Sequence, residues 1–157
     1  MFFERQDSIT PDDVLISANF VYGWMPTMLK NVDFLNLERV ADILTSVKKG
    51  KILDVNELNL VRSITNNSIV GASKLLHFVE PNNYAIWDSR VCRYIYQTDK
   101  YVYNNIIYMS YLEKCRHFSK LPEFGEFFDL VSAQFPFAIS KMRALDVVMF
   151  TGGSRSS

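Results

Sequence analysis

The chain has 157 residues, 48% of them hydrophobic and 14% aromatic, so it can bury a core and is not expected to be disordered. Its 17 Lys and Arg balance 17 Asp and Glu, so net charge alone predicts no polyanion partner, although a local basic patch stays open. There is neither a basic N-terminal region followed by an apolar run nor an uncharged apolar stretch of about 18 residues, so we expect a cytoplasmic protein without a signal peptide or membrane span.

Apolar residues spaced three and four apart dominate the chain, and capping or breaking residues divide them into seven or eight short helices. In the first, Thr10 supplies a capping hydroxyl, Pro11 takes the first helical position, and the acids of 12–13 suit the positive end of the helix dipole. The predicted helices are 11–22, 37–47, 55–65, the segment between Ser68 and Glu80, 89–96, 100–118, 123–135 and 138–150.

The segment 101–108 contains β-favouring residues and offers a short strand as an alternative to helix, but no alternating partner strand is evident. The sequence therefore predicts an all-α fold. We expect a single helical domain over residues 1–150, followed by a flexible C-terminal tail over 151–157.

Cys92 and Cys115 are the only cysteines, and with His77 and His117 they form no zinc-binding spacing. Their apolar, helix-like surroundings indicate buried free thiols, and His77 is interpreted as a core histidine. We expect neither a metal nor another cofactor.

The stretch 71–96 places Lys74 on an apolar helix, then a Pro-Asn-Asn loop, then Asp88 at the start of the next helix. This order resembles the core of the helix-hairpin-helix DNA glycosylase superfamily, where a hairpin and often a lysine precede a Val-Asp-Thr-His-Val pattern. Ile86-Trp87-Asp88-Ser89-Arg90-Val91 stands at that pattern, so Asp88 matches the family's carboxylate. The run 143–152 is similar to the closing helix. The resemblance centres on residues 68–96 and implies a glycosylase-like fold, DNA binding and a role in DNA repair.

Asp88 is the first candidate for catalysis. Cleavage of a nucleotide's glycosidic bond passes through an oxocarbenium-like sugar, which a fixed carboxylate stabilises while it activates water. At a helix start, the dipole favours the ionised carboxylate. Alternatively, Asp88 or Ser89 only caps the helix, and the two roles are compatible.

Lys74 falls near the lysine that bifunctional family members use as a nucleophile, so it is the second catalytic candidate. That role needs a lowered pKa, and the alternatives are a surface lysine or a cation partner for Asp88 or Glu80. Trp87 and Tyr84 are candidates for stacking on an extruded base, or else they fill the core.

Several small and basic residues are candidates for holding phosphates. For Lys141 and Arg143, near the end of the chain, the alternative interpretation is a solvated helix face followed by a loose tail. The residues expected to contact nucleic acid are Gly71, Ser73, Arg90, Lys141 and Arg143.

Our leading hypothesis is a divergent DNA glycosylase-like hydrolase that binds DNA and removes a modified or damaged base through Asp88. The alternative is an inactive helical module that keeps the fold and binds a protein or nucleic acid, which the single glycine of the turn and the neutral charge favour. A third hypothesis is a structural protein whose aromatic surfaces form a homo-oligomer, since 12 Phe and 8 Tyr are many for one small core.

Overall fold

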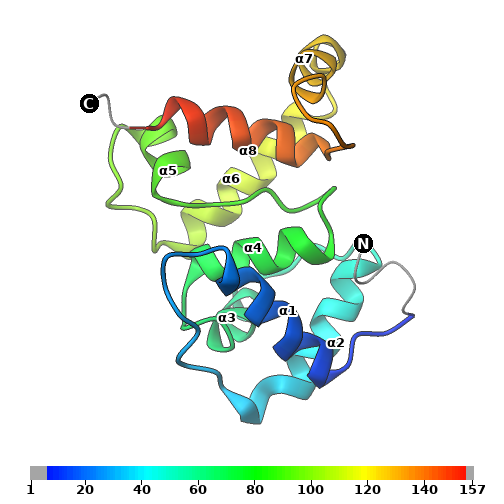
Figure 1. The fold of residues 1–157 in the computed structure, drawn as a ribbon, viewed down its shortest axis with the longest axis vertical. Coiled ribbons are helices and arrows are strands. Elements are labelled where there is room, and N and C mark those ends of the chain that lie inside the picture. The colour runs from blue at the N-terminus through cyan, green and yellow to red at the C-terminus, as the bar shows by residue number, and fades with distance from the viewer. Residues whose placement is uncertain (1–6, 155–157) are drawn as a thin grey trace. The chain divides into compact units, whose positions relative to one another are not determined.

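The structure, a computed structural model, describes residues 7–154 of the chain. Over that range all regular elements are helical and no strand forms, which confirms the all-α prediction (Figure 1). The elements are α1 (Pro11–Gly23), the 3-10 helix η1 (Phe34–Asn36), α2 (Leu37–Lys48), α3 (Val55–Ser63), α4 (Ile69–Val79), α5 (Ser89–Tyr96), α6 (Asn105–Phe118), α7 (Phe124–Ser132) and α8 (Lys141–Gly152).

The chain divides into two compact units, Met1–Glu80 and Pro81–Ser157. The first unit contains α1 to α4: α1 packs on α2 and α4, and α3 packs on the same two helices. The second unit contains α5 to α8, and α8 contacts all three of its other helices, α5 most extensively. The expectation of one domain over 1–150 stays a prediction.

Side-chain caps explain where most of these helices begin. Thr10 and Asp13 form a reciprocal capping box at α1, and Asp54 and Glu57 form another at α3. The starts of α4, α5, α6 and α8 are each capped by one oxygen-bearing side chain, which satisfies backbone N–H groups that have no partner within the helix. These caps are Ser68, Asp88, Asn104 and Ser140.

The turn between α3 and α4 depends on two asparagines in the left-handed region, Asn66 at φ 55° and Asn67 at φ 53°. The Asn66 side chain accepts hydrogen bonds from the backbone N–H groups of Lys30 and Asn31 at 2.7 and 2.8 Å. Its amide nitrogen donates to the Met28 carbonyl at 2.8 Å. The turn therefore also holds the loop between α1 and η1.

Aromatic residues fill the core of the second unit. Trp87 is completely buried, its ring centroid lies 5.0 Å from that of Tyr111, and its indole N–H donates to the Val102 carbonyl at 2.9 Å. Residues 100–103 form a turn that presents this carbonyl, so α6 begins at Asn105, later than the expected 100, and no strand forms over 101–108. Of the β-favouring residues 101–103 only Val102 is buried, and all three belong to the turn and not to a sheet.

Helix α8 ends at Gly152, two residues beyond the expected end at 150, and Gly153 caps it. Gly153 is buried, and a Cβ atom there would lie far closer to the Arg90 carbonyl oxygen than van der Waals contact allows. The start of the expected tail at 151 therefore belongs to the packed fold, while 155–157 lie outside the described residues.

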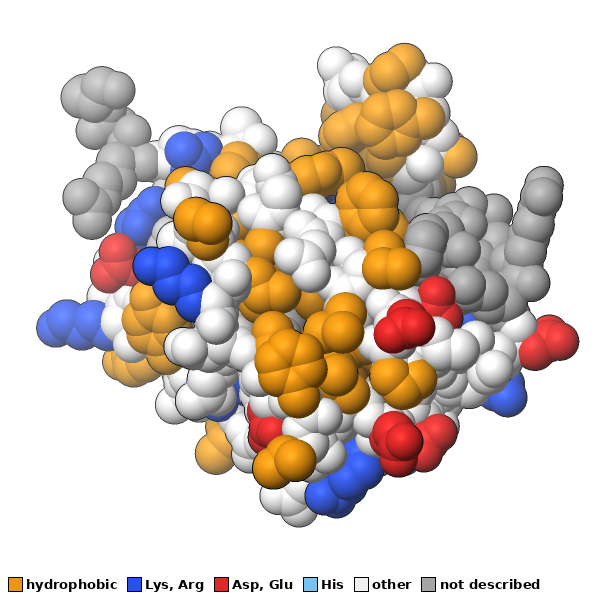
Figure 2. All heavy atoms as spheres, turned by 60° about the horizontal axis from the view of Figure 1, so that its bottom comes forward, with side chains coloured by type: hydrophobic (Ala, Val, Ile, Leu, Met, Phe, Trp, Pro, Cys, Tyr) orange, Lys and Arg blue, Asp and Glu red, His pale blue; other side chains and the backbone are white. Residues whose placement is uncertain are grey.

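Exposed apolar side chains are numerous on the surface. Trp24, Leu35 and Met28 are 90%, 95% and 75% exposed. The face in Figure 2 shows hydrophobic groups among both acidic and basic side chains, without one uniform basic surface. Between residues 7 and 154, no helix combines the length and hydrophobicity needed to cross a bilayer.

Candidate functional site around Asp88

The extended segment that leads into α5 is fixed by hydrogen bonds from α6 and α8. The Tyr111 hydroxyl donates to the Ile86 carbonyl at 3.1 Å, and the Ile86 N–H donates to Asp146 Oδ2 at 3.1 Å. Farther back, Arg116 Nη1 donates to the Asn83 carbonyl at 3.2 Å. Together with the buried Trp87, these bonds fix the backbone that carries Asp88.

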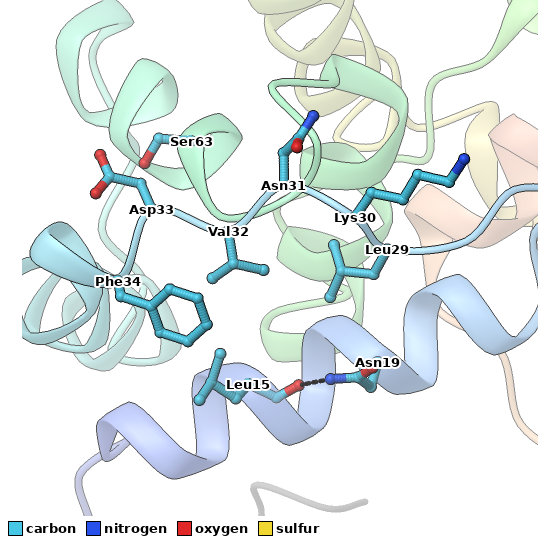
Figure 3. Close-up of a pocket in the computed structure, with 9 residues that line it drawn as sticks. All are labelled: Leu15, Asn19, Leu29, Lys30, Asn31, Val32, Asp33, Phe34 and Ser63. Carbon is cyan, nitrogen blue, oxygen red and sulfur yellow. Dashed lines mark hydrogen bonds between the residues drawn. The ribbon is translucent and has the colours of Figure 1, made fainter.

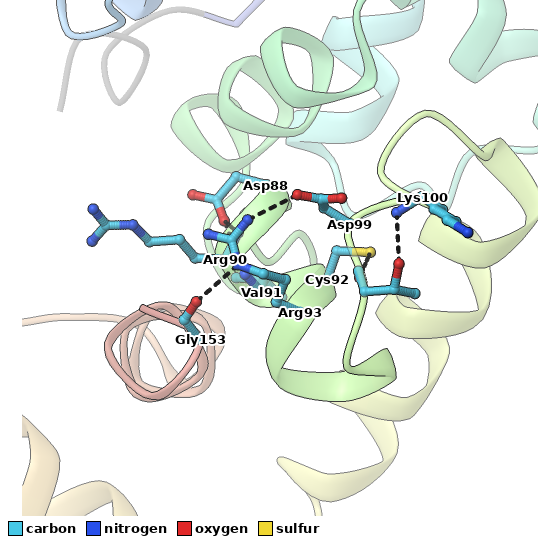
Figure 4. A network of polar contacts seen from close by, with 9 residues as sticks. Asp88, Arg90, Val91, Cys92, Arg93, Asp99, Lys100 and Gly153 are labelled. Carbon is cyan, nitrogen blue, oxygen red and sulfur yellow. Dashed lines mark hydrogen bonds and ion pairs between the residues drawn. The ribbon is translucent and has the colours of Figure 1, made fainter. Parts of the chain in front are cut away.

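Asp88 caps α5 with one of its two carboxylate oxygens. Oδ1 accepts hydrogen bonds from the backbone N–H groups of Arg90 and Val91, at 2.8 and 3.0 Å. Oδ2 has no hydrogen-bond partner among residues 7–154, and the residue is only half-buried (Figure 4). The capping interpretation is therefore correct for Oδ1, and Oδ2 stays available to another group.

Two arginines of α5 interact with the C-terminal end of α8. Arg93 Nε donates to the Gly153 carbonyl at 3.2 Å, and its Nη1 pairs with Asp99 Oδ2 at 3.1 Å (Figure 4). Arg90 lies over the Phe150 ring, 4.4 Å from its centroid. A cation at a helix C-terminus is stabilised by the negative end of the dipole. Both side chains thus have structural contacts, but Arg90 remains exposed.

Asp146 of α8 is a second carboxylate close to this segment, and it is 1% exposed. Arg143 Nη1 donates to its Oδ1 at 2.5 Å, while Oδ2 accepts from the Ile86 N–H. Burial raises the pKa of Asp146 to about 7, against the lowering effect of Arg143. The sequence interpretation did not single out Asp146; a lone acid within the apolar run 144–150 was the available signal.

The remaining sequence-predicted residues have different positions. Trp87 and Tyr84, the candidates for base stacking, are 0% and 1% exposed, so neither ring presents an open face in this conformation. Gly71 and Ser73 are also buried. A Cβ atom on Gly71 would lie 2.7 Å from the Tyr22 hydroxyl, so this glycine permits close packing of α4 on α1.

The predicted phosphate-binding cations are not clustered. Lys141 is exposed at the start of α8, where its Nζ donates to the Ser119 carbonyl at 3.0 Å. Arg143 is paired with Asp146, and Arg90 contacts the opposite end of this 12-residue helix, which spans about 18 Å. Lys74 is half-buried on α4 of the first unit, whereas Asp88 belongs to the second unit.

Asp88 is not among the residues that line two open cavities. One, of about 550 Å³, is lined by Arg93, Tyr94, Gln97, Gly152, Gly153 and Ser154. The other, of about 680 Å³, lies in the first unit between α1 and the loop 29–34 (Figure 3). Leu15, Val32 and Phe34 point into it, but its lining is mixed, because polar and charged residues contribute as well: Asn19, Lys30, Asn31, Asp33 and Ser63.

Residues 7–154 contain no group of three or more His, Cys, Asp or Glu able to hold a metal ion. Cys92 and Cys115 are free and buried, as predicted. Burial raises the pKa of both thiols, that of Cys115 to about 12. A reactive cysteine needs a lowered pKa, so neither thiol is suited to nucleophilic chemistry.

No protein-family model, curated protein or solved structure matches this chain.

Proposed function

We propose that the protein is a divergent DNA glycosylase-like hydrolase in which Asp88 stabilises the sugar cation formed as a base departs. One observation carries this proposal: Asp88 Oδ1 is anchored by two backbone N–H groups, while Oδ2 has no hydrogen-bond partner in the described part of the chain. A carboxylate held in this way combines a fixed position with an available negative charge.

Cleavage of the glycosidic bond requires a negative charge beside the sugar, on a side chain that moves little during the reaction. As the glycosidic bond lengthens, positive charge develops on the sugar, and a carboxylate already in position stabilises it without reorganisation. The same Oδ2 can accept a proton from the attacking water. The bonds to residues 83, 86 and 87 supply the rigidity that such a site needs.

Asp88→Asn tests the proposal, because asparagine caps a helix about as well as aspartate but lacks the charge. We expect base release from a panel of lesion-containing DNA duplexes to fall by about 100- to 1,000-fold, with little change in melting temperature. Asp99→Asn is the matched control, since it removes a carboxylate paired with Arg93 in the same unit and should leave base release unchanged.

Lys74 enters the proposal as a nucleophile or as electrostatic support. If a Schiff base forms, borohydride traps the wild-type protein on DNA and does not trap Lys74→Ala. The catalytic proposal is rejected if no lesion yields an abasic product with the wild type and Asp88→Asn sharply lowers the melting temperature.

The alternative function is a binding module without catalysis. The specific observation in its favour is that Trp87 and Tyr84 are buried, so they offer no base pocket in this conformation. A module that binds nucleic acid is expected to lose affinity steeply with salt, because Lys and Arg release counterions from phosphates. If DNA binding is absent even at low salt, a protein partner becomes the better hypothesis.

A further inference from the structure

Asp146 is a buried carboxylate whose two oxygens are both engaged. Its Oδ1 accepts from Arg143 at 2.5 Å, and its Oδ2 accepts from the Ile86 backbone N–H at 3.1 Å. The side chain is 1% exposed, so water competes little for these bonds. It links α8 to the segment before Asp88, and 60 residues of sequence separate the two bonded groups.

Such a group is costly in a protein interior. Removing a charge from water is unfavourable, and apolar residues of similar volume often stabilise a fold as well as a buried ion pair does. The desolvation is visible in the raised pKa of Asp146. Packing alone therefore does not explain why a carboxylate stands at this position. Its specific hydrogen bond to the Ile86 backbone N–H does explain it.

The bond to Ile86 restrains the peptide two residues before Asp88. In an extended segment, residues two apart project to the same side, so the orientation of residue 86 helps to set that of residue 88. The Tyr111 hydroxyl fixes the other side of the same residue through the Ile86 carbonyl. Loss of the Asp146 oxygen would leave the Ile86 N–H without its acceptor beside a buried core.

We propose that Asp146 is a positioning residue, which acts through the Ile86 N–H to hold Asp88 Oδ2 in the orientation that catalysis needs. The proposal rests on the proposed function of Asp88 and adds to it a residue that never touches the substrate.

The test compares two double variants that differ in one feature. Arg143→Met with Asp146→Asn removes both charges but retains an acceptor oxygen for the Ile86 N–H. Arg143→Met with Asp146→Leu removes the same charges and also the acceptor, with the same branching and the same number of side-chain heavy atoms. Met142→Ala, at a buried position of α8, is a control for general loss of packing.

Two readouts separate positioning from stability. The NMR amide resonances of Arg90 and Val91, which bond to Asp88 Oδ1, should stay near their wild-type shifts in the asparagine variant and in Met142→Ala, and move in the leucine variant. In single-turnover base release, the leucine variant should be at least about tenfold slower than the asparagine variant, with DNA affinity unchanged within about twofold, since misplacement of a reacting group by about 1 Å costs up to 100-fold.

The outcomes distinguish this inference from the proposed function. If the amide resonances and the rates of the two double variants agree, Asp146 does not position Asp88, and base release by the wild type would still support the proposed function. If the resonances move only in the leucine variant while the wild type releases no base, Asp146 controls the conformation of Asp88 and the proposed function is wrong.

Discussion

Asp88 and Asp146 belong to the same unit, but their surroundings differ. Asp88 is half-buried at a helix start, where two backbone N–H groups bond to one of its oxygens. Asp146 is buried within α8, where desolvation opposes ionisation and Arg143 favours it. The first is therefore suited to presenting a charge to a ligand, and the second to holding neighbouring backbone in place.

The raised pKa of Asp146 gives a testable dependence of stability on pH. Between pH 3.8, the ordinary value, and about 7, the folded protein retains a proton on Asp146 that the unfolded chain releases. The contribution of this residue to the free energy of unfolding is therefore full below about pH 4 and is lost as the pH rises through about 7. We expect denaturant titrations to show a smaller decline over this range for Asp146→Asn than for the wild type.

Other groups near Asp146 do not produce the same signal. Burial raises the pKa values of Tyr108, Tyr111 and Cys115, so these groups stay neutral between pH 3.8 and about 7. Asp129→Asn, at an exposed site on α7, provides a control. Parallel curves for the wild type and Asp146→Asn would contradict the prediction. The titratable groups that face Asp146 are Arg143, Asp88, Tyr108, Tyr111 and Cys115.

Single residues also show what sequence could predict about the site. Asp88 was identifiable because a carboxylate at a helix start is a local signal. Asp146 carried only the signal of an acid within an apolar run, and its role was not predictable, because its partner Ile86 lies 60 residues away and the bond exists only after α8 packs beside the segment. For Trp87, the sequence left stacking and core packing open, and only the fold shows the ring to be fully buried.

At the scale of elements, the contact between α5 and α8 depends on a missing side chain. Gly153 follows α8 and lies against the Arg90 carbonyl, and the Arg93 side chain donates to the Gly153 carbonyl at 3.2 Å. The two helices approach closely at this point because glycine has no Cβ atom.

Gly153→Ala should therefore destabilise the protein. Its methyl group would overlap backbone, which cannot rotate away, and overpacking of this kind costs about 1–3 kcal/mol. Gly125→Ala is the matched control: a Cβ atom at this residue of α7 would meet no other atom within 4 Å, so alanine should be neutral or stabilise by about 0.5–1 kcal/mol. Thermal unfolding measures both, and equal effects of the two substitutions would refute the role of Gly153.

Most element boundaries were predictable because caps are local. The starts of α1 and α5 agree with the prediction, and their caps, Thr10 and Asp88, stand in the sequence itself. The start of α6 was placed too early, because the apolar residues of 101–103 continue the helical pattern while the structure uses them in a turn. In that turn the Val102 carbonyl accepts from the Trp87 indole N–H, 15 residues away in sequence, and a contact of this kind is not contained in the local pattern.

At the scale of the whole molecule, the chain has two tryptophans, and each unit contains one. Trp24 of the first unit is 90% exposed and Trp87 of the second is 0% exposed. Trp87 is therefore expected to emit at shorter wavelength and to be protected from aqueous quenchers.

This difference tests the prediction of a single domain. In Trp24→Phe, fluorescence reports only the second unit, whereas far-ultraviolet circular dichroism reports the helices of both. If the chain unfolds as one domain, the two denaturant transitions should coincide. Midpoints that differ beyond experimental error would instead show that the units unfold separately.

The two buried thiols of the second unit can report its transient opening. Cys92 and Cys115 are 0% and 1% exposed and both have raised pKa values, so a thiol reagent in solution meets no thiolate while the unit is closed. The thiols are therefore labelled only when local fluctuations expose Cys92 on α5 or Cys115 on α6. Cys92 lies on α5, the helix that Asp88 caps. The labelling rate of Cys92 therefore measures how often this helix unfolds locally.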